Sequence, residues 1–168
     1  DGIKVAAQIA AKKTASNLTG DFSEIKESRG ESAYILKNGK TYLASVVEAL
    51  GTKNLVADAF KTSKKSYYDV IGHDTVATIV NDLITVGAKP LVVNAYWAVG
   101  DSKWFLDKNR VSDLIKGWQN ACDLAAAAWG GGETPTIKGI IKKNTCDLGG
   151  SAVGIIKDKK NLITDKNL

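Results

Sequence analysis

Asp74-Thr-Val-Ala-Thr-Ile-Val-Asn-Asp-Leu-Ile-Thr-Val86 is the stretch of sequence that decides the fold. At about 100° per residue, its polar side chains fall on one narrow arc and apolar side chains cover nearly all the rest, with Thr75 the only exception. The arc consists of Asp74, Thr78, Asn81, Asp82 and Thr85. A surface helix normally has the opposite proportions. We therefore predict a helix that is buried on most sides and whose carboxylates are paired, hydrogen-bonded or bound to metal. The alternative is that the arc faces solvent.

Working outward from this helix, the pattern predicts a mixed α+β fold rather than strict βαβ alternation. Helices are expected over residues 3–15, 53–60 and 111–125, and the longest helix is expected to begin at Tyr67 or Asp69. Strands are expected over residues 33–36, 41–47, 90–99, 126–129, 137–141 and 148–156. Asn38-Gly39 predicts a hairpin because both positions tolerate positive φ. The strand over 126–129 is expected to be short and buried, and Gly149-Gly150 is expected to interrupt the last strand.

Composition limits the classes of function. The chain has 168 residues, 44% of them hydrophobic and 24% charged, which predicts one compact domain. The net charge of +5 favours phosphorylated ligands, but the lysines are scattered and form no basic stripe with aromatic residues, so no nucleic-acid partner is expected. We expect no membrane segment and no secretory leader, and hence a cytoplasmic location. Cys122 and Cys146 lack metal-type spacing and are predicted to be small buried hydrophobes.

Three regions are predicted along the chain. Residues 1–32 form an N-terminal helix and a mobile loop, and residues 33–157 form the main domain. Residues 158–168 have the composition of a linker to a C-terminal domain that is absent from this sequence.

Two further motifs bring acids and glycines to places where the chain changes direction. Glu48 ends a strand and is followed by Gly51-Thr52-Lys53, whose backbone amides and lysine charge suit a phosphate at a helix start, although such a tripeptide is also an ordinary turn. Gly130-Gly131-Gly132 precedes Glu133 and gives a backbone that a ligand can approach closely. Oxygen ligands without histidine or thiol favour magnesium. The sequence therefore predicts a magnesium ion that arrives with a phosphate.

In combination, these motifs resemble the N-terminal domain of the aminoimidazole ribonucleotide synthetase superfamily, whose enzyme is also called phosphoribosylformylglycinamidine cyclo-ligase. Glu48–Lys53 resembles the family's Asp-Gly-Val-Gly-Thr-Lys. Ile71–Ala77 and Val80–Leu83 resemble Ile-Gly-Ile-Asp-Leu-Val-Ala and Val-Asn-Asp-Leu. Gly131–Thr134 repeats Gly-Gly-Glu-Thr, and Asp147–Gly154 resembles Asp-Leu-Ala-Gly-Phe-Ala-Val-Gly.

The resemblance implies an ATP-binding domain that dimerises through its sheet and acts on a small phosphorylated substrate. ATP would phosphorylate an amide oxygen, and an internal nitrogen would then close the imidazole ring of a purine precursor. It implies magnesium ligands at Glu48, Asp74, Asp82 and Glu133. It implies nucleotide contacts at Gly51, Thr52, Lys53, Asn81, Gly132 and Thr134, with Lys53 also in the catalytic role. Without its C-terminal half, the domain is expected to be inactive alone.

Other interpretations stay open at this stage. The family's first motif begins with aspartate where Glu48 stands, and Glu27–Ser32 replaces its glycine-rich loop. A related small-molecule kinase, such as thiamine monophosphate kinase, and a non-catalytic dimerisation or ligand-sensing module are the alternatives. His73 is expected to be structural. Tyr96, Trp97 and Trp104 are expected to pack in the core or a dimer, or else to stack on a base or ribose.

Overall fold

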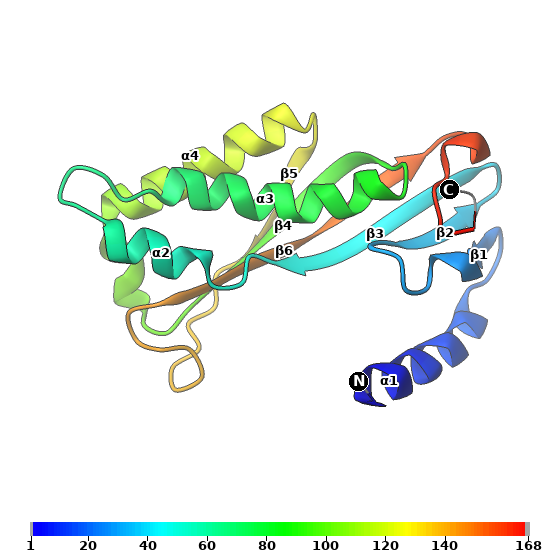
Figure 1. Ribbon diagram of the computed structural model, residues 1–168, viewed down its shortest axis with the longest axis horizontal. Helices are drawn as coiled ribbons and strands as arrows, with labels where there is room; N and C mark the ends of the chain where they lie inside the picture. Colours follow the sequence, from blue (N-terminus) through cyan, green and yellow to red (C-terminus); the bar gives the residue numbers. More distant parts are fainter. Residues whose placement is uncertain (1, 167–168) are drawn as a thin grey trace.

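The computed structural model describes residues 2–166 and consists of a long mixed sheet with helices on one face (Figure 1). The strands are β1 (Phe22–Glu24), β2 (Tyr34–Asn38), β3 (Thr41–Ala49), β4 (Lys89–Val99), β5 (Ala128–Glu133) and β6 (Cys146–Ile156). Their order in the sheet is β1-β2-β3-β6-β4-β5, and only the β4–β5 pair is parallel. The predicted α+β fold with a mixed sheet is confirmed.

Four α-helices accompany the sheet in the described residues: α1 (Gly2–Lys13), α2 (Lys53–Phe60), α3 (Tyr68–Thr85) and α4 (Lys108–Leu124). Short 3₁₀ helices are η1 (Thr14–Asn17), η2 (Lys26–Ser28), η3 (Ser102–Leu106) and η4 (Lys159–Asn161). Figure 1 shows α3 and α4 side by side above the sheet, whereas α1 lies apart from the body. No helix within residues 2–166 is long and apolar enough to cross a membrane.

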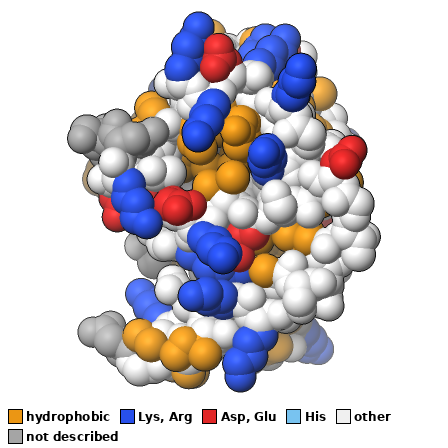
Figure 2. All heavy atoms as spheres, turned by 90° about the vertical axis from the view of Figure 1, so that its right-hand side faces the viewer, with side chains coloured by type: hydrophobic (Ala, Val, Ile, Leu, Met, Phe, Trp, Pro, Cys, Tyr) orange, Lys and Arg blue, Asp and Glu red, His pale blue; other side chains and the backbone are white. Residues whose placement is uncertain are grey.

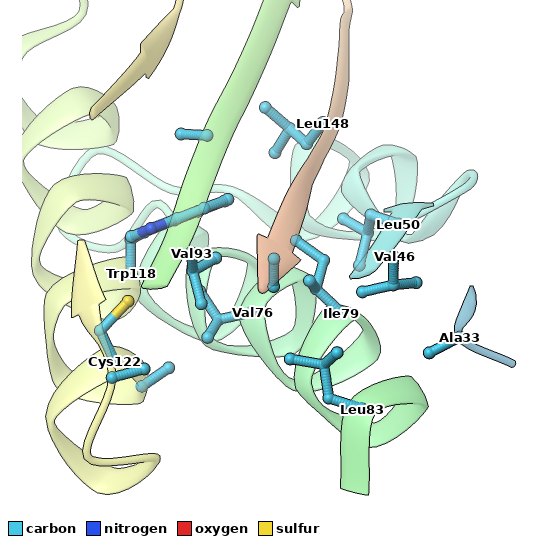
Figure 3. Packing of buried hydrophobic residues seen from close by; sticks show 14 of the residues in the cluster. Ala33, Val46, Leu50, Val76, Ile79, Leu83, Val93, Trp118, Cys122 and Leu148 are labelled. Carbon is cyan, nitrogen blue, oxygen red and sulfur yellow. The ribbon is translucent and has the colours of Figure 1, made fainter. Parts of the chain in front are cut away.

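The core lies between the sheet and the helix pair α3–α4. Figure 3 shows Ile79 and Leu83 of α3 beside Val46 of β3, and Trp118 of α4 beside Val93 of β4. All five side chains are buried. Alternate residues of each strand meet the helices because side chains alternate between the two faces of a strand. The other face of the sheet has no helix over it in the described part of the chain (Figure 1).

The hairpin prediction is confirmed, with a small change in the turn. Asn38 pairs with Thr41, so the two loop residues are Gly39 and Lys40. Of these two, Gly39 takes a positive φ, at 58°. The longest helix begins at Tyr68, one residue from each of the two predicted starts, and Tyr67, with φ of 65°, directly precedes it.

Three predictions about strands are wrong. β5 is exposed along its whole length, because it is the edge strand of the sheet. Residues 137–141 form a turn across the end of β4, in which the Ile137 N–H donates to the Val99 carbonyl, 2.7 Å away. β6 runs without interruption through Gly149-Gly150, because β3 and β4 pair with it on both sides.

The N-terminal loop and the C-terminal segment both contain more structure than a free loop or linker. Within residues 17–31, β1 adds to the sheet, Arg29 forms an ion pair with Glu24, and the buried Ser28 hydroxyl accepts from the Ile35 N–H. At the other end, the Ile163 N–H donates to the Val86 carbonyl at 3.2 Å. This end of the chain therefore packs on the domain, and the last two residues of the predicted linker lie outside the described part.

One end of the molecule, seen in Figure 2, carries lysine and arginine side chains with acidic and hydrophobic side chains between them. The hydrophobic atoms at the bottom of that view belong to α1, where Ile3 is 83% exposed. This mixture agrees with the scattered lysines of the sequence pattern.

Candidate functional site

A hollow of about 600 Å³ lies over the middle of the sheet, where β3, β6, β4 and β5 are neighbours. Its lining comes from all four strands and consists of Val47, Glu48, Ala49, Asn94, Ala95, Tyr96, Gly132, Glu133, Asp147, Gly149, Gly150 and Ser151. Two rows of paired residues cross it. The first is Glu48, Gly150, Ala95 and Gly132, and the second is Ala49, Gly149, Tyr96 and Glu133.

Glycines allow the strands to come together around the hollow. A Cβ added at Gly150 would lie 2.2 Å from the Asn94 carbonyl oxygen and 2.9 Å from Cδ1 of Ile79. A Cβ at Gly132 would lie 2.2 Å from the Ala95 carbonyl oxygen. Side chains at these positions would push neighbouring backbone apart, so the glycine motifs of the sequence have a packing role here in addition to the predicted binding role.

The pleat of the sheet separates the predicted acids. Glu48 is in the row of Gly150, and the contact of Gly150 with Ile79 of α3 shows that this row faces the helices. Glu133 is in the row of Tyr96, which faces the opposite, open side. Because successive rows point to opposite faces, Glu48 and Glu133 line one hollow but start from different faces of the sheet.

Glu48 and Asp82 are the acids that the structure brings together. Burial, the negative charge of Glu48 and a hydrogen bond with Glu48 raise the pKa of the Asp82 carboxyl above its ordinary value of 3.8. Two carboxyls that share a site resist double ionisation, and a cation between them would relieve the repulsion. The pair thus joins the end of β3 to the polar arc of α3.

The polar arc is neither fully buried nor fully exposed to solvent, which were the two environments predicted for it. Asp74 and Asp82 are half-buried, whereas Asn81 and Thr85 are exposed. Several hydroxyls on this face bond to helix carbonyls, such as Thr78 to the Asp74 carbonyl at 2.9 Å. Residues 74–86 are also less buried than predicted, since Ile84 is 50% exposed and Ala77 and Val80 are only partly buried.

Lys53 and Asp74 form a second charged group near the start of α2. Lys53 Nζ lies 3.2 Å from Asp74 Oδ2, and His73 Nδ1 lies 3.9 Å from the other Asp74 oxygen. Gly51 has a φ of 74°, which turns the chain from β3 into α2, and Thr52 occupies the position before the helix. A groove of about 420 Å³ beside this pair is lined mainly by apolar residues of α2 and α3.

The remaining predicted residues occupy exposed positions. Asn81 is on α3, Gly132 is in β5, and Thr134 directly follows β5. Among residues 2–166, no group of three or more histidine, cysteine, aspartate or glutamate side chains is close enough together to hold a metal ion. The four-acid magnesium site therefore stays a prediction, and only its Glu48–Asp82 pair is assembled.

Sequence reasoning assigned no binding role to several residues of the hollow. Asp147, Asn94 and Ser151 are these residues. Tyr96, for which stacking on a base or ribose was one of the expected roles, also lines the hollow and is 38% exposed. Asp147 stands in the Asp-Leu-Gly-Gly motif, and its place two residues before Gly149 would have indicated the open face. Trp97 and Trp104 are buried in the core, as expected.

The fold and the hollow define a two-layer α+β domain whose candidate ligand site lies on the sheet and has carboxylates and glycines in its lining. Residues 30–156 match the family described as AIR synthase related protein, N-terminal domain. The match covers most of the chain, and the chain belongs to this family.

Curated relatives agree with this assignment, and a solved structure shares the fold. The phosphoribosylformylglycinamidine cyclo-ligase of Carboxydothermus hydrogenoformans is 41% identical over 70% of this chain and 32% of its own length. That of Thermococcus kodakarensis is 34% identical over 94% of this chain and 44% of its own length. The solved structure of AaThiL complexed with AMPPCP and TMP has a TM-score of 0.59 at 13% identity, over 76% of this chain and 37% of that one. The chain thus spans less than half the length of these relatives.

Proposed function

We propose that this chain is the ATP- and magnesium-binding half of a cyclo-ligase that phosphorylates an amide oxygen and closes an imidazole ring, as in purine biosynthesis. The observation that carries the proposal is Glu48, which lines the hollow over β3, β6, β4 and β5 and also pairs with Asp82 of α3 on the helical side of the sheet. Membership of the family and the names of the relatives support it. The AMPPCP in the AaThiL complex supports a nucleotide as ligand.

The residues present fit a magnesium ion. Burial first, and then the charge of Glu48 and a hydrogen bond with it, raise the pKa of Asp82, and no cation within residues 2–166 forms an ion pair with either acid. The donors are all oxygen, which suits a hard divalent cation. Glu48 and Asp82 would hold the ion directly. Asp74, now paired with Lys53, would join only after its side chain turns. Glu133 lies three strands from Glu48 and on the opposite face of the sheet, so rotation of its side chain alone would not bring it to this ion.

Bound ATP would supply the phosphoryl group that activates the amide oxygen. Lys53 would then place its positive charge beside the phosphates, and the backbone N–H groups of the Gly51–Lys53 turn would donate to phosphate oxygens at the start of α2. Asn81, Gly132 and Thr134 would complete the contacts with nucleotide. The half that relatives have beyond this chain would supply the remaining part of the site, so we expect no ring closure by the 168-residue chain alone.

Binding of magnesium-ATP tests the proposal directly. Calorimetric titration of the 168-residue chain should show binding that requires magnesium and that falls at least tenfold in Asp82→Asn and in Lys53→Gln. Asp123→Asn and Lys116→Gln, both exposed on α4, are matched controls and should bind like the unmodified chain. If the unmodified chain gives no heat with magnesium-ATP, or if all four variants bind equally, the proposal should be abandoned.

We also propose that two copies associate through the open face of the sheet. That face carries exposed apolar side chains, of which Val47 is 81% exposed and Tyr96 is 38% exposed. The face that meets the helices is already covered. A second copy would cover the open face and would bring its own hollow close to the first.

The kinase alternative has weaker support, because the likeness to AaThiL concerns the fold alone at 13% identity. Phosphate release by a full-length relative, with and without candidate acceptors, separates a kinase from a cyclo-ligase. The non-catalytic alternative rests on the altered segment Glu27–Ser32, and it predicts no ATP hydrolysis under any of these conditions.

A further inference from the structure

A second hollow, of about 220 Å³, lies beyond the C-terminal end of β4 and shares no lining residue with the hollow over the sheet. Its lining comes from η3 and the turn before it, from α4 and from the loop that precedes β6. The residues are Asp101, Lys103, Trp104, Arg110, Lys143 and Asn144. Three cationic side chains from three separate segments therefore share one small space.

The positive charge of this hollow exceeds the negative charge around it. Asp101 is the only acid in the lining contributed by residues 2–166, and its Oδ1 already accepts from the Lys103 backbone N–H at 2.9 Å. Behind the lining, Asp58 Oδ1 lies 3.7 Å from Arg110 Nη1. A third acid, Asp107, accepts from the Arg110 backbone N–H at 3.1 Å but forms its ion pair with Lys61. The lining itself thus holds one acid and three cations.

An adjoining hollow adds to the positive charge. It has a volume of about 450 Å³ and shares Asp101 and Lys143 with the first. Its described lining also includes Lys138 and Lys142 and no acid other than Asp101. A negatively charged ligand in the first hollow would therefore have two more lysines at its exit.

Two buried donors in the lining have no acceptor in the described part of the protein. Trp104 is 3% exposed, and neither its Nε1–H nor the Nε–H of Arg110 meets an acceptor among the described residues. The Arg110 guanidinium lies over the Trp104 ring at 4.1 Å and donates through Nη2 to the Trp104 carbonyl at 2.8 Å. These contacts fix the guanidinium plane. Because both N–H groups are closed off from solvent, the hollow meets the charge of the guanidinium rather than these two donors.

We propose that this hollow binds the phosphate group of a small ligand, at a site separate from the ATP site. The guanidinium held against Trp104 and the two exposed ammonium groups offer positive charge and charged donors to a compact anion with several oxygens. The hollow is smaller than the usual size of a site for a whole small molecule, about 300–1,000 Å³, so the phosphate would enter it and the rest of the ligand would lie in the adjoining hollow. Four of the lysines that are scattered along the sequence thus lie around these two adjoining hollows.

Titration with inorganic phosphate at constant ionic strength, against a chloride background, tests this site in the 168-residue chain. The double variant Lys103→Gln/Lys143→Gln should bind phosphate at least tenfold more weakly than the unmodified chain. Both side chains are exposed, so folding should be unaffected, and urea unfolding checks this. The matched control is Lys116→Gln/Lys157→Gln, which removes the same charge from exposed positions outside the hollow and should bind within twofold of the unmodified chain.

A third variant separates this site from the ATP site. Lys53→Gln should leave phosphate binding unchanged within twofold if phosphate occupies the hollow beside Arg110. Loss of phosphate binding in Lys53→Gln but not in Lys103→Gln/Lys143→Gln would overturn the proposal while supporting the ATP site. Equal loss in the control double variant, or no binding by the unmodified chain, would also overturn it and would leave the magnesium-ATP test unaffected.

Discussion

Asp82 and Glu48 are two acids from distant parts of the chain that the fold holds against each other. Within residues 2–166, no lysine, arginine or histidine forms an ion pair with either of them, whereas Asp74 pairs with Lys53. Such a pair destabilises the domain when both groups are charged, and natural proteins tolerate this mainly where function requires it. Its energetic signature can be measured without any ligand.

The substitution Asp82→Asn should stabilise the domain at neutral pH. The folded-state pKa of Asp82 is raised, so the stability associated with its protonated form is fully present below its ordinary value of 3.8 and is lost as pH rises through the raised value. The amide resembles the protonated form at every pH. We expect a gain of up to about 1 kcal/mol at pH 7.5 in urea unfolding, because the pair is partly screened by solvent, and a smaller gain at pH 4. Asp123→Asn should give no gain, and a destabilised Asp82→Asn at pH 7.5 would contradict the coupling.

The two cysteines should be chemically inert in the folded domain. Burial raises the pKa of both thiols to about 11, and Cys146 also lies 3.3 Å from the Asn54 side-chain nitrogen. Because the thiolate is the nucleophile, a chromogenic disulfide should react with neither cysteine at pH 8 until the chain is unfolded. Because the folded-state pKa values are raised, the protonated thiols contribute stability that is fully present below the ordinary value of 9.0. This stability is lost as pH rises through about 11. Rapid reaction of one thiol per chain at pH 8 would show that the burial is wrong.

Helix α3 links the core to the candidate site, since one of its faces meets the sheet and the other carries the polar arc. Leu83 is fully buried and Ile84, the next residue, is 50% exposed, so the two give a matched pair. We expect Leu83→Ala to cost about 2–5 kcal/mol of unfolding free energy, because it leaves a cavity between α3 and β6. Ile84→Ala should cost less than about 1 kcal/mol. Similar losses for both variants in urea unfolding would contradict the orientation of α3.

Elements with strong periodic or turn signals could be predicted from the sequence, and those that depend on neighbours could not. The hairpin at Gly39 and the helix from Tyr68 follow from local signals. β5 was expected to be buried because Ala126–Trp129 is apolar, but its position at the sheet edge is decided by which strand pairs with β4. Gly149-Gly150 predicted a break, but pairing with β3 on one side and β4 on the other keeps β6 continuous through these glycines.

The candidate site was predictable only in part, for a related reason. The polar arc and the strand-end acid pointed to a contact between Asp82 and Glu48, which the structure forms. Whether Glu133 joins them depends on the register of four strands, since a shift by one residue moves a side chain to the other face. The register between strands that are distant in sequence cannot be predicted from any local sequence pattern.

On the scale of the whole molecule, the sheet has one covered face and one open face. The helices bury the residues that alternate with Val47 along β3, while Val47 itself points away from them. One end of the sheet is occupied by the turn at residues 137–141, which bonds to the end of β4. The part of the open face that surrounds the larger hollow is thus available to a second copy.

Val47→Lys should convert a dimer of the 168-residue chain into a monomer. Burial of Val47 against a second sheet favours association, and a lysine there would have to lose its hydration against an apolar surface. In sedimentation velocity, the unmodified chain should move as twice 17.9 kDa, and Val47→Lys as 17.9 kDa. Val56→Lys is the matched control, because Val56 is 61% exposed on α2, on the helical side, and should leave the dimer intact. Dissociation by Val56→Lys alone would place the contact on the helices. If the unmodified chain is itself a monomer, a second copy does not cover the open face and the proposed association is wrong.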